Sequence, residues 1–98
     1  MIIKKVREQI ELTQGPVAKL IKHTDHYKVI VIGLKKGMVW KEHKTGVPAT
    51  LIVSEGHILY SELERTVDLK KDDDFEIPVN VLHGLLAKED SICFLIQG

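Results

Sequence analysis

The sequence predicts an all-β fold, either a sandwich or a small barrel built from many short strands. Apolar residues occur in short alternating or continuous runs, which is the pattern of strands, and helical periodicity is nearly absent. Turn-forming residues separate these runs at close and regular spacing. In a chain of 98 residues, so many short strands bury their apolar faces only in facing sheets or in a closed barrel.

The predicted strands follow one another along the whole chain. In the first half they are residues 2–6, 10–12, 17–22, 27–34 and 38–43. In the second half they are residues 49–54, 58–63, 67–69, 75–77, 82–87 and 92–96. The one stretch whose spacing also allows a helical turn is residues 4–11.

Glycine and proline mark the turns between these strands. Gly37 and Gly56 suit tight hairpins, because glycine adopts a positive φ at little cost. Pro78 lacks an amide proton, so we expect it to end the strand at residues 75–77. No repeat, linker or low-complexity segment interrupts the pattern, which predicts a single domain over residues 1–98.

The charge balance excludes some classes of partner. Lys plus Arg equals Asp plus Glu at 14 each, so there is no basic excess to neutralise phosphates, and we expect no nucleic-acid partner. The apolar runs are far shorter than the roughly 20 residues of a membrane-spanning helix, so we expect no membrane association. The charged N-terminus is unlike a secretory signal and Cys93 is the sole cysteine. These features predict a cytoplasmic location.

Two segments resemble the motifs of the cupin family. The first cupin motif has a glycine, two histidines, a glutamate and a second glycine at set spacing. Gly37, His43 and Gly56 stand at three of these places, Thr45 replaces the second histidine and Ala49 replaces the glutamate. The match continues into the second motif and covers most of the chain.

The second cupin motif is kept in spacing and only partly in chemistry. Pro78 and His83 match it, whereas Asp72, Asn80 and Ala87 replace its two glycines and its final asparagine. The resemblance implies a small single-domain, RmlC-like cupin whose fold is the cupin double-stranded β-helix, a jelly-roll barrel. Small cupins commonly form homodimers. Residues 1–12, predicted as an N-terminal strand segment outside the motifs, would then be the dimer contact or a cover for their own barrel.

In metal-binding cupins, three histidines and a glutamate from the two motifs hold one divalent ion. Only His43 and His83 remain here, which is an incomplete ligand set for zinc, nickel, iron or manganese. The two histidines instead suit a metal-free pocket for a small polar molecule, or a pair of hydrogen-bonded core residues. The sequence therefore predicts no certain cofactor, with a divalent ion on His43 and His83 as an open alternative.

The predicted ligand-binding pocket contains His43, Thr45, His83, Trp40 and Tyr60. Thr45 would either contact the ligand or cap the turn at residues 44–48. Trp40 and Tyr60 would form walls of the pocket or belong to the plain core. Three functions remain open: binding of a small polar molecule, a metal-dependent enzyme of the dioxygenase or isomerase type, and a non-catalytic structural or sensory module.

Three other side chains that could bind a metal or react have simpler structural explanations. His23 and His26 bracket Thr24-Asp25, which is the composition of a polar hairpin tip. Cys93 lies in an apolar run, where a cysteine behaves as a small buried group.

Overall fold

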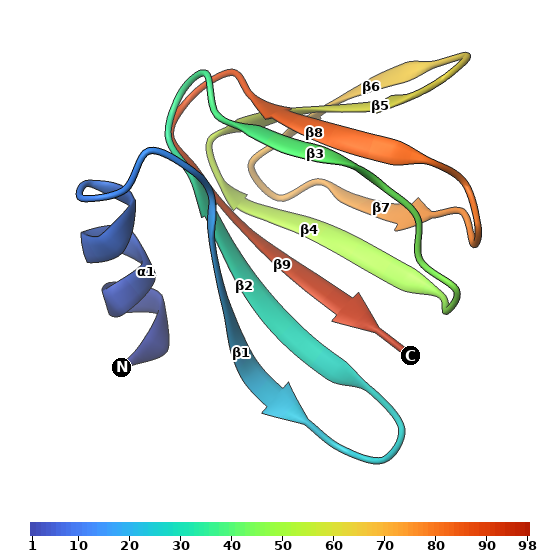
Figure 1. Cartoon of the computed structure of the whole chain (residues 1–98), viewed down its shortest axis with the longest axis horizontal. Helices are drawn as coiled ribbons and strands as arrows, with labels where there is room; N and C mark the ends of the chain where they lie inside the picture. Colours follow the sequence, from blue (N-terminus) through green and yellow to red (C-terminus); the bar gives the residue numbers. More distant parts are fainter.

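Two antiparallel sheets and one helix make up the computed structural model, which describes residues 1–98 (Figure 1). The five-stranded sheet has, in spatial order, β1 (Val17–His23), β2 (Lys28–Leu34), β9 (Ser91–Gln97), β4 (Ala49–Glu55) and β7 (Asp74–Ile77). The four-stranded sheet has β3 (Val39–His43), β8 (His83–Ala87), β5 (His57–Glu62) and β6 (Thr66–Lys70). The all-β prediction is confirmed, and each of the nine strands overlaps a predicted one.

The predicted strands at residues 2–6 and 10–12 are wrong, because this segment forms helix α1 (Ile2–Ile10). Its apolar residues recur at helical spacing, so that Val6 and Ile10 share one face and are both buried. The helix buries them together, so residues 1–12 are not an added strand.

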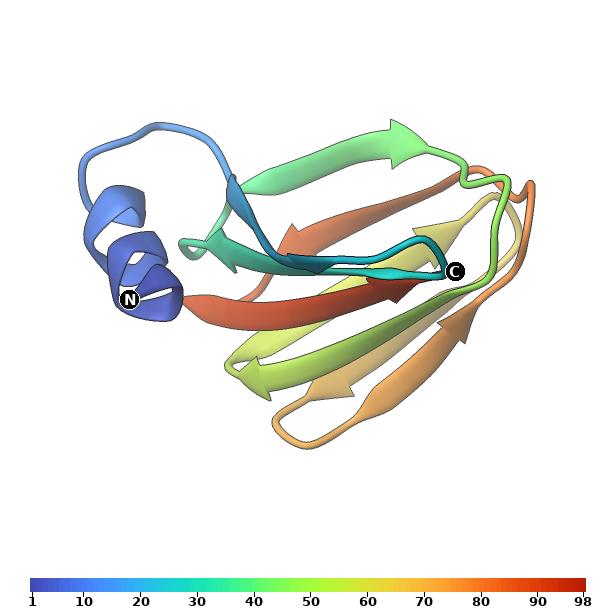
Figure 2. The same cartoon turned by 90° about the horizontal axis from the view of Figure 1, so that it is seen from below.

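Helix α1 lies outside the barrel, against β1 and β2 (Figures 1 and 2). Val6 and Ile10 pack with Val17, Val31 and Ile92 in a small outer cluster. The helix therefore covers the outer face of its own sheet, which is one of the two roles expected for residues 1–12.

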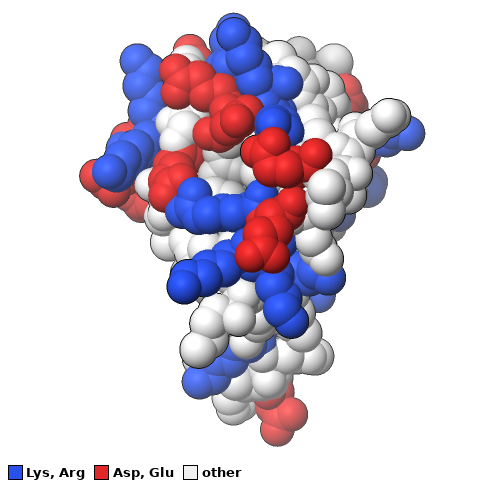
Figure 3. Space-filling view, turned by 90° about the vertical axis from the view of Figure 1, so that its left-hand side faces the viewer, with Lys and Arg blue, Asp and Glu red and all other residues white.

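The contact between α1 and the sheet requires a glycine on β2. A Cβ on Gly33 would lie only 2.6 Å from Val6 Cγ1 and 2.8 Å from Ile10 Cγ2. Ion pairs from the last turn of the helix and from its C-cap residue, Glu11, add to this contact. Arg7 binds Glu55 through both carboxylate oxygens, and Lys35 Nζ lies 2.7 Å from Glu11 Oε2. On the molecular face shown in Figure 3, acidic and basic side chains lie interspersed.

The main core lies between the two sheets. Alternate residues of the strands point into it, including Ile32, Leu51, Ile58 and Tyr60, all at most 2% exposed. Odd positions of β4 and even positions of β2 and β5 therefore define the inner face.

The single helix is too short and too polar to span a membrane.

The backbone adopts positive φ at all four glycine places of the two cupin-like motifs. Gly37 and Gly56 have φ of 89° and 92°, and the two replacements Asp72 and Asn80 have φ of 72° and 61°. Asp and Asn are the non-glycine residues that enter this region most readily. The replacements therefore preserve the turns of the motifs, and the only other positive φ is at the terminal Gly98.

Candidate functional site

His43 and His83 face each other at one end of the barrel. They are directly opposite in the β3–β8 pairing, and their ring centroids are 4.5 Å apart. His83 is 2% exposed and His43 is half-buried at the mouth. The structure thus brings together the two histidines that the motif spacing singled out.

Hydrogen bonds fix the orientation of both imidazoles. His43 Nδ1 lies 3.1 Å from the carbonyl oxygen of Lys41, and His83 Nδ1 lies 3.0 Å from that of Val81. A carbonyl oxygen can only accept, so Nδ1 carries a proton, and in the neutral ring Nε2 then keeps its lone pair. Nε2 of His83 has no hydrogen-bond partner in the protein. Every fully enclosed side-chain nitrogen or oxygen has such a partner, so this Nε2 atom is accessible from the mouth of the barrel.

Trp40 joins the same face through an irregularity in β3. Trp40 pairs with Leu85 and His43 pairs with His83, so three positions on β3 match two on β8. This bulge offsets the ordinary alternation and turns both side chains inward. The Trp40 ring is half-buried against the core and lies 6.1 Å from the His43 ring, edge to face.

Tyr60 forms the floor of the site beneath His83. The two rings are nearly parallel, with centroids 5.6 Å apart, and Tyr60 is fully buried. Its hydroxyl donates a hydrogen bond to Glu62. Burial and this hydrogen bond both raise the pKa of Tyr60, so the phenol stays protonated.

Glu62 is a member of the site that sequence reasoning missed. It is opposite His83 in the β5–β8 pairing and its side chain is 12% exposed. Arg65 donates to both carboxylate oxygens, at 2.8 and 3.0 Å. These bonds, and then the one from Tyr60, hold the pKa of Glu62 below its usual value. The period-two alternation from Ile58 and Tyr60 was the signal for an inward Glu62.

The hydroxyl of Thr45 is engaged in a turn. It donates to the carbonyl oxygen of Val47 at 3.0 Å and accepts from the Val47 amide at 3.3 Å. Strand β3 ends at His43, so Thr45 does not continue the face of that histidine. The turn-capping alternative describes its hydroxyl, although Thr45 also lines the groove described next.

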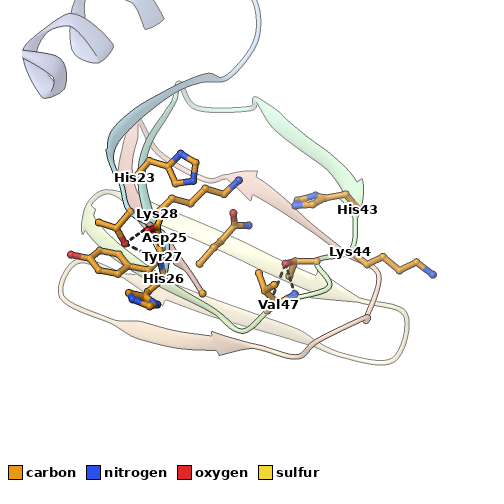
Figure 4. Close-up of a pocket in the computed structure, with 12 residues that line it drawn as sticks. His23, Asp25, His26, Tyr27, Lys28, His43, Lys44 and Val47 are labelled. Atoms are coloured by element: carbon orange, nitrogen blue, oxygen red, sulfur yellow. Dashed lines mark hydrogen bonds between the residues drawn. The ribbon is translucent and has the colours of Figure 1, made fainter.

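A polar groove of about 450 Å³ opens at this end of the barrel (Figure 4). It lies between the tip of the β1–β2 hairpin, the end of β3 and the end of β9. His23, Lys28, His43 and Gln97 are among its lining residues. His23 and His26 do bracket the tip of a hairpin, as predicted, and both line this groove.

Strand pairing places the inward side chains at this end of the barrel in two facing rows, of which His23, Lys28, Gln97 and His43 line the groove. Across the five-stranded sheet the row is His23, Lys28, Gln97, Ala49 and Ile77. Ala49 and Ile77 belong to the inner core, so the row points into the barrel. Across the other sheet the row is His43, His83 and Glu62.

The donor set does not fit a complete metal centre. His43 and His83 offer two Nε2 lone pairs, whereas zinc sites use three or four protein ligands. Ala49 has no donor, and Glu62 is bound by Tyr60 and Arg65. No three His, Cys, Asp or Glu side chains are grouped closely enough to hold an ion.

No family model matches the sequence, and the search of curated proteins found no match. Solved structures do match in fold. A cupin superfamily protein from Desulfitobacterium hafniense DCB-2 has a TM-score of 0.80 at 13% identity, over 86% of this chain and 77% of its own. KdgF from Halomonas sp. has a TM-score of 0.77 at 22% identity, over 88% and 82% of the two chains.

A larger protein contains the same fold as a part. The salicylate 1,2-dioxygenase from Pseudaminobacter salicylatoxidans has a TM-score of 0.88 at 18% identity, over 97% of this chain and 32% of its own. At these identities the similarity concerns the fold. The chain has the cupin fold, the double-stranded β-helix, and His43 and His83 lie at the mouth of its barrel.

Proposed function

We propose that the protein binds a small polar molecule at the mouth of its barrel, in contact with His43 and His83. One observation carries this proposal: both imidazoles are held by their own strands through Nδ1, which leaves two Nε2 lone pairs for a ligand. A hydroxyl or amine of the ligand can donate to them. The groove of about 450 Å³ has the size of a small-molecule site.

The walls of this site support a ligand with an apolar part as well. The Trp40 ring lies beside His43, and the Tyr60 ring lies beneath His83. The half-buried Trp40 ring can pack against the carbon skeleton of a ligand while the histidines bind its polar groups, whereas the fully buried Tyr60 supports His83 from beneath. Thr45, at the rim, adds its methyl group rather than its engaged hydroxyl.

Binding is expected to depend on the two histidines. We expect hits from a screen of small polar metabolites to change the fluorescence of Trp40, the sole tryptophan, and to shift the NMR signals of the His43 and His83 rings. His43→Ala with His83→Ala should weaken such binding about tenfold or more, because two hydrogen bonds to the ligand are lost. The matched control is His57→Gln, on the outer face of β5.

Two other functions are outcomes of the same experiment. Near-stoichiometric metal in untagged protein, lost in the double histidine variant, would favour the metal-dependent enzyme over our proposal. A screen in which no molecule perturbs His43 or His83 would favour the structural or sensory module. Unchanged binding in the double variant would contradict this site.

We also propose that the protein forms a homodimer through the β1 edge. This edge strand has unpaired backbone groups on one side, and apolar side chains of β1 and α1 are exposed beside it: Met1, Ile2, Ile3, Leu20 and Ile21. An exposed apolar edge favours pairing with a second copy. Residues 1–12 would contribute to the dimer contact through the N-terminal end of helix α1.

Light scattering tests this proposal. We expect the wild type to have twice the 11.1 kDa mass of one chain, and Ile21→Lys to have the mass of one. Leu63→Lys is the matched control, since Leu63 is also exposed but lies in the distant β5–β6 turn. A monomeric wild type, or a dimeric Ile21→Lys, would contradict the β1 edge as the interface.

A cytoplasmic location is part of the proposal. The sole cysteine, Cys93, is buried in the core, and burial raises the pKa of its thiol to about 12. A thiol kept neutral in this way is a packing group and not a nucleophile. A chain without disulfides is typical of a reducing compartment.

A further inference from the structure

We infer that the molecule bound at this mouth carries an anionic group, a carboxylate or a phosphate, and that Lys28 recognises it. The inference rests on the proposed function and names the class of ligand for that same site. Four features of Lys28 lead to it: its direction, its lack of an ion pair, its neighbours and its position relative to His43.

Lys28 points into the barrel. It is directly opposite Gln97 on β9, which is directly opposite Ala49 on β4, and Ala49 is a buried residue of the inner core. Along β2, Lys28 continues the inward series of Ile30 and Ile32. Lys28 as a whole is half-buried, and its side chain lines the groove, where an anionic ligand can reach its ammonium.

The protein supplies no ion-pair partner for Lys28. Its ion pairs use Arg7, Lys35, Arg65 and His57, and none includes Lys28. Glu62, the carboxylate on the inner face at this end, is already bound by Arg65 and Tyr60. Asp25, at the tip of the hairpin, forms no ion pair. Lys28 therefore forms no ion pair within the chain, although Asp25 lines the same groove.

The neighbours of Lys28 add hydrogen-bond donors. His23 is opposite it on β1 and Gln97 is opposite it on β9, so all three share one face of the sheet. Figure 4 shows the Lys28 side chain reaching into the groove between His23 and His43, whereas Lys44 extends away. An ammonium flanked by an imidazole and an amide is a suitable cradle for a carboxylate or a phosphate.

This local charge is not a property of the whole protein, whose formal net charge is zero. Anion recognition by Lys28 and hydrogen bonding by His43 can take place in the same groove, because both side chains line it. A single ligand can therefore place its anionic group against Lys28 and a hydroxyl or amine against Nε2 of His43.

Three probes test the inference: succinate, inorganic phosphate, and succinamide as the neutral match of succinate. Binding is followed by NMR shifts of backbone amides and of the His43 and His83 rings. We expect the protein to bind succinate or phosphate and to bind succinamide about tenfold or more weakly, since hydrogen bonds to a charged group are the stronger ones. Succinate alone indicates a carboxylate ligand, and phosphate alone a phosphate ligand.

Variants of Lys28 separate its charge from its bulk. Lys28→Met should weaken anion binding about tenfold or more, and Lys28→Arg should retain most of it. Lys22→Met is the matched control, because it removes the same charge from the outer face of the same hairpin. Anion binding that is equal in Lys28→Met and Lys22→Met would overturn the inference.

The two proposals can fail separately. If neutral molecules bind in dependence on His43 and His83, and no anion depends on Lys28, the ligand site stands and its anionic class is wrong. If anions bind through Lys28 without any shift of the His43 or His83 rings, Lys28 is an anion site but the proposed histidine site is wrong.

Discussion

Gly56→Ala is expected to destabilise the protein by about 3 kcal/mol or more. Gly56 has a φ of 92°, a conformation that costs an alanine about 1–2 kcal/mol. Its Cβ would also lie 2.2 Å from Ser91 Oγ and 2.4 Å from the backbone oxygen of Asp90. Since a backbone atom cannot move aside cheaply, the β4–β5 turn has to separate from the start of β9. Chemical denaturation measures the loss.

Two other glycines provide matched controls for Gly56→Ala. Gly37 has a φ of 89°, but a Cβ at this position would meet nothing within 4 Å, so Gly37→Ala should show the cost of the dihedral angle alone. Gly15 has neither feature, so Gly15→Ala should be neutral or slightly stabilising. Equal losses at positions 56 and 37 would mean that the close contact with residues 90 and 91 has no energetic weight.

Alternation of apolar residues was sufficient to predict the strands, because in a barrel every strand has one face in the core. It failed at residues 2–6 and 10–12. There the two predicted strands are short, and so short a window fits both a strand and a helix. Packing decided between them: Gly33 leaves space for Val6 and Ile10 to dock together.

Motif spacing predicted which two histidines come together, but it did not predict the side chains that only strand register places beside them. His43 and His83 are brought together by the β3–β8 pairing, as the two segments indicated. Lys28 and Glu62 became visible only when strand pairing showed that they continue the inner rows. A charged residue at a strand end is usually solvated, so the residue type argued against an inward position.

Tyr60→Ala is expected to destabilise the protein by about 3–5 kcal/mol, the usual cost of removing a buried aromatic side chain. Tyr60 is fully buried between two rings, with the Phe75 centroid at 4.5 Å and the His83 centroid at 5.6 Å. Its loss would leave a cavity directly beneath the histidine. We therefore expect a broadened His83 ring signal in addition to a lower midpoint of denaturation.

Tyr60→Phe separates the ring from the hydroxyl. Phenylalanine fills the same space, so most of the stability should return and the His83 signal should stay sharp. The hydroxyl is one of the groups that lower the pKa of Glu62, so this pKa should rise toward its ordinary value of 4.5 in the variant, while Arg65 keeps it from rising fully.

The sign of the pH effect follows from that shift. A carboxylate with a depressed pKa stabilises the folded state above its unfolded pKa, and this contribution disappears as the pH falls through the folded value. The difference in melting temperature between wild type and Tyr60→Phe should therefore be largest near neutral pH and shrink in acid below 4.5. A difference that is constant with pH would mean that the hydroxyl stabilises the barrel by packing and not through the charge of Glu62.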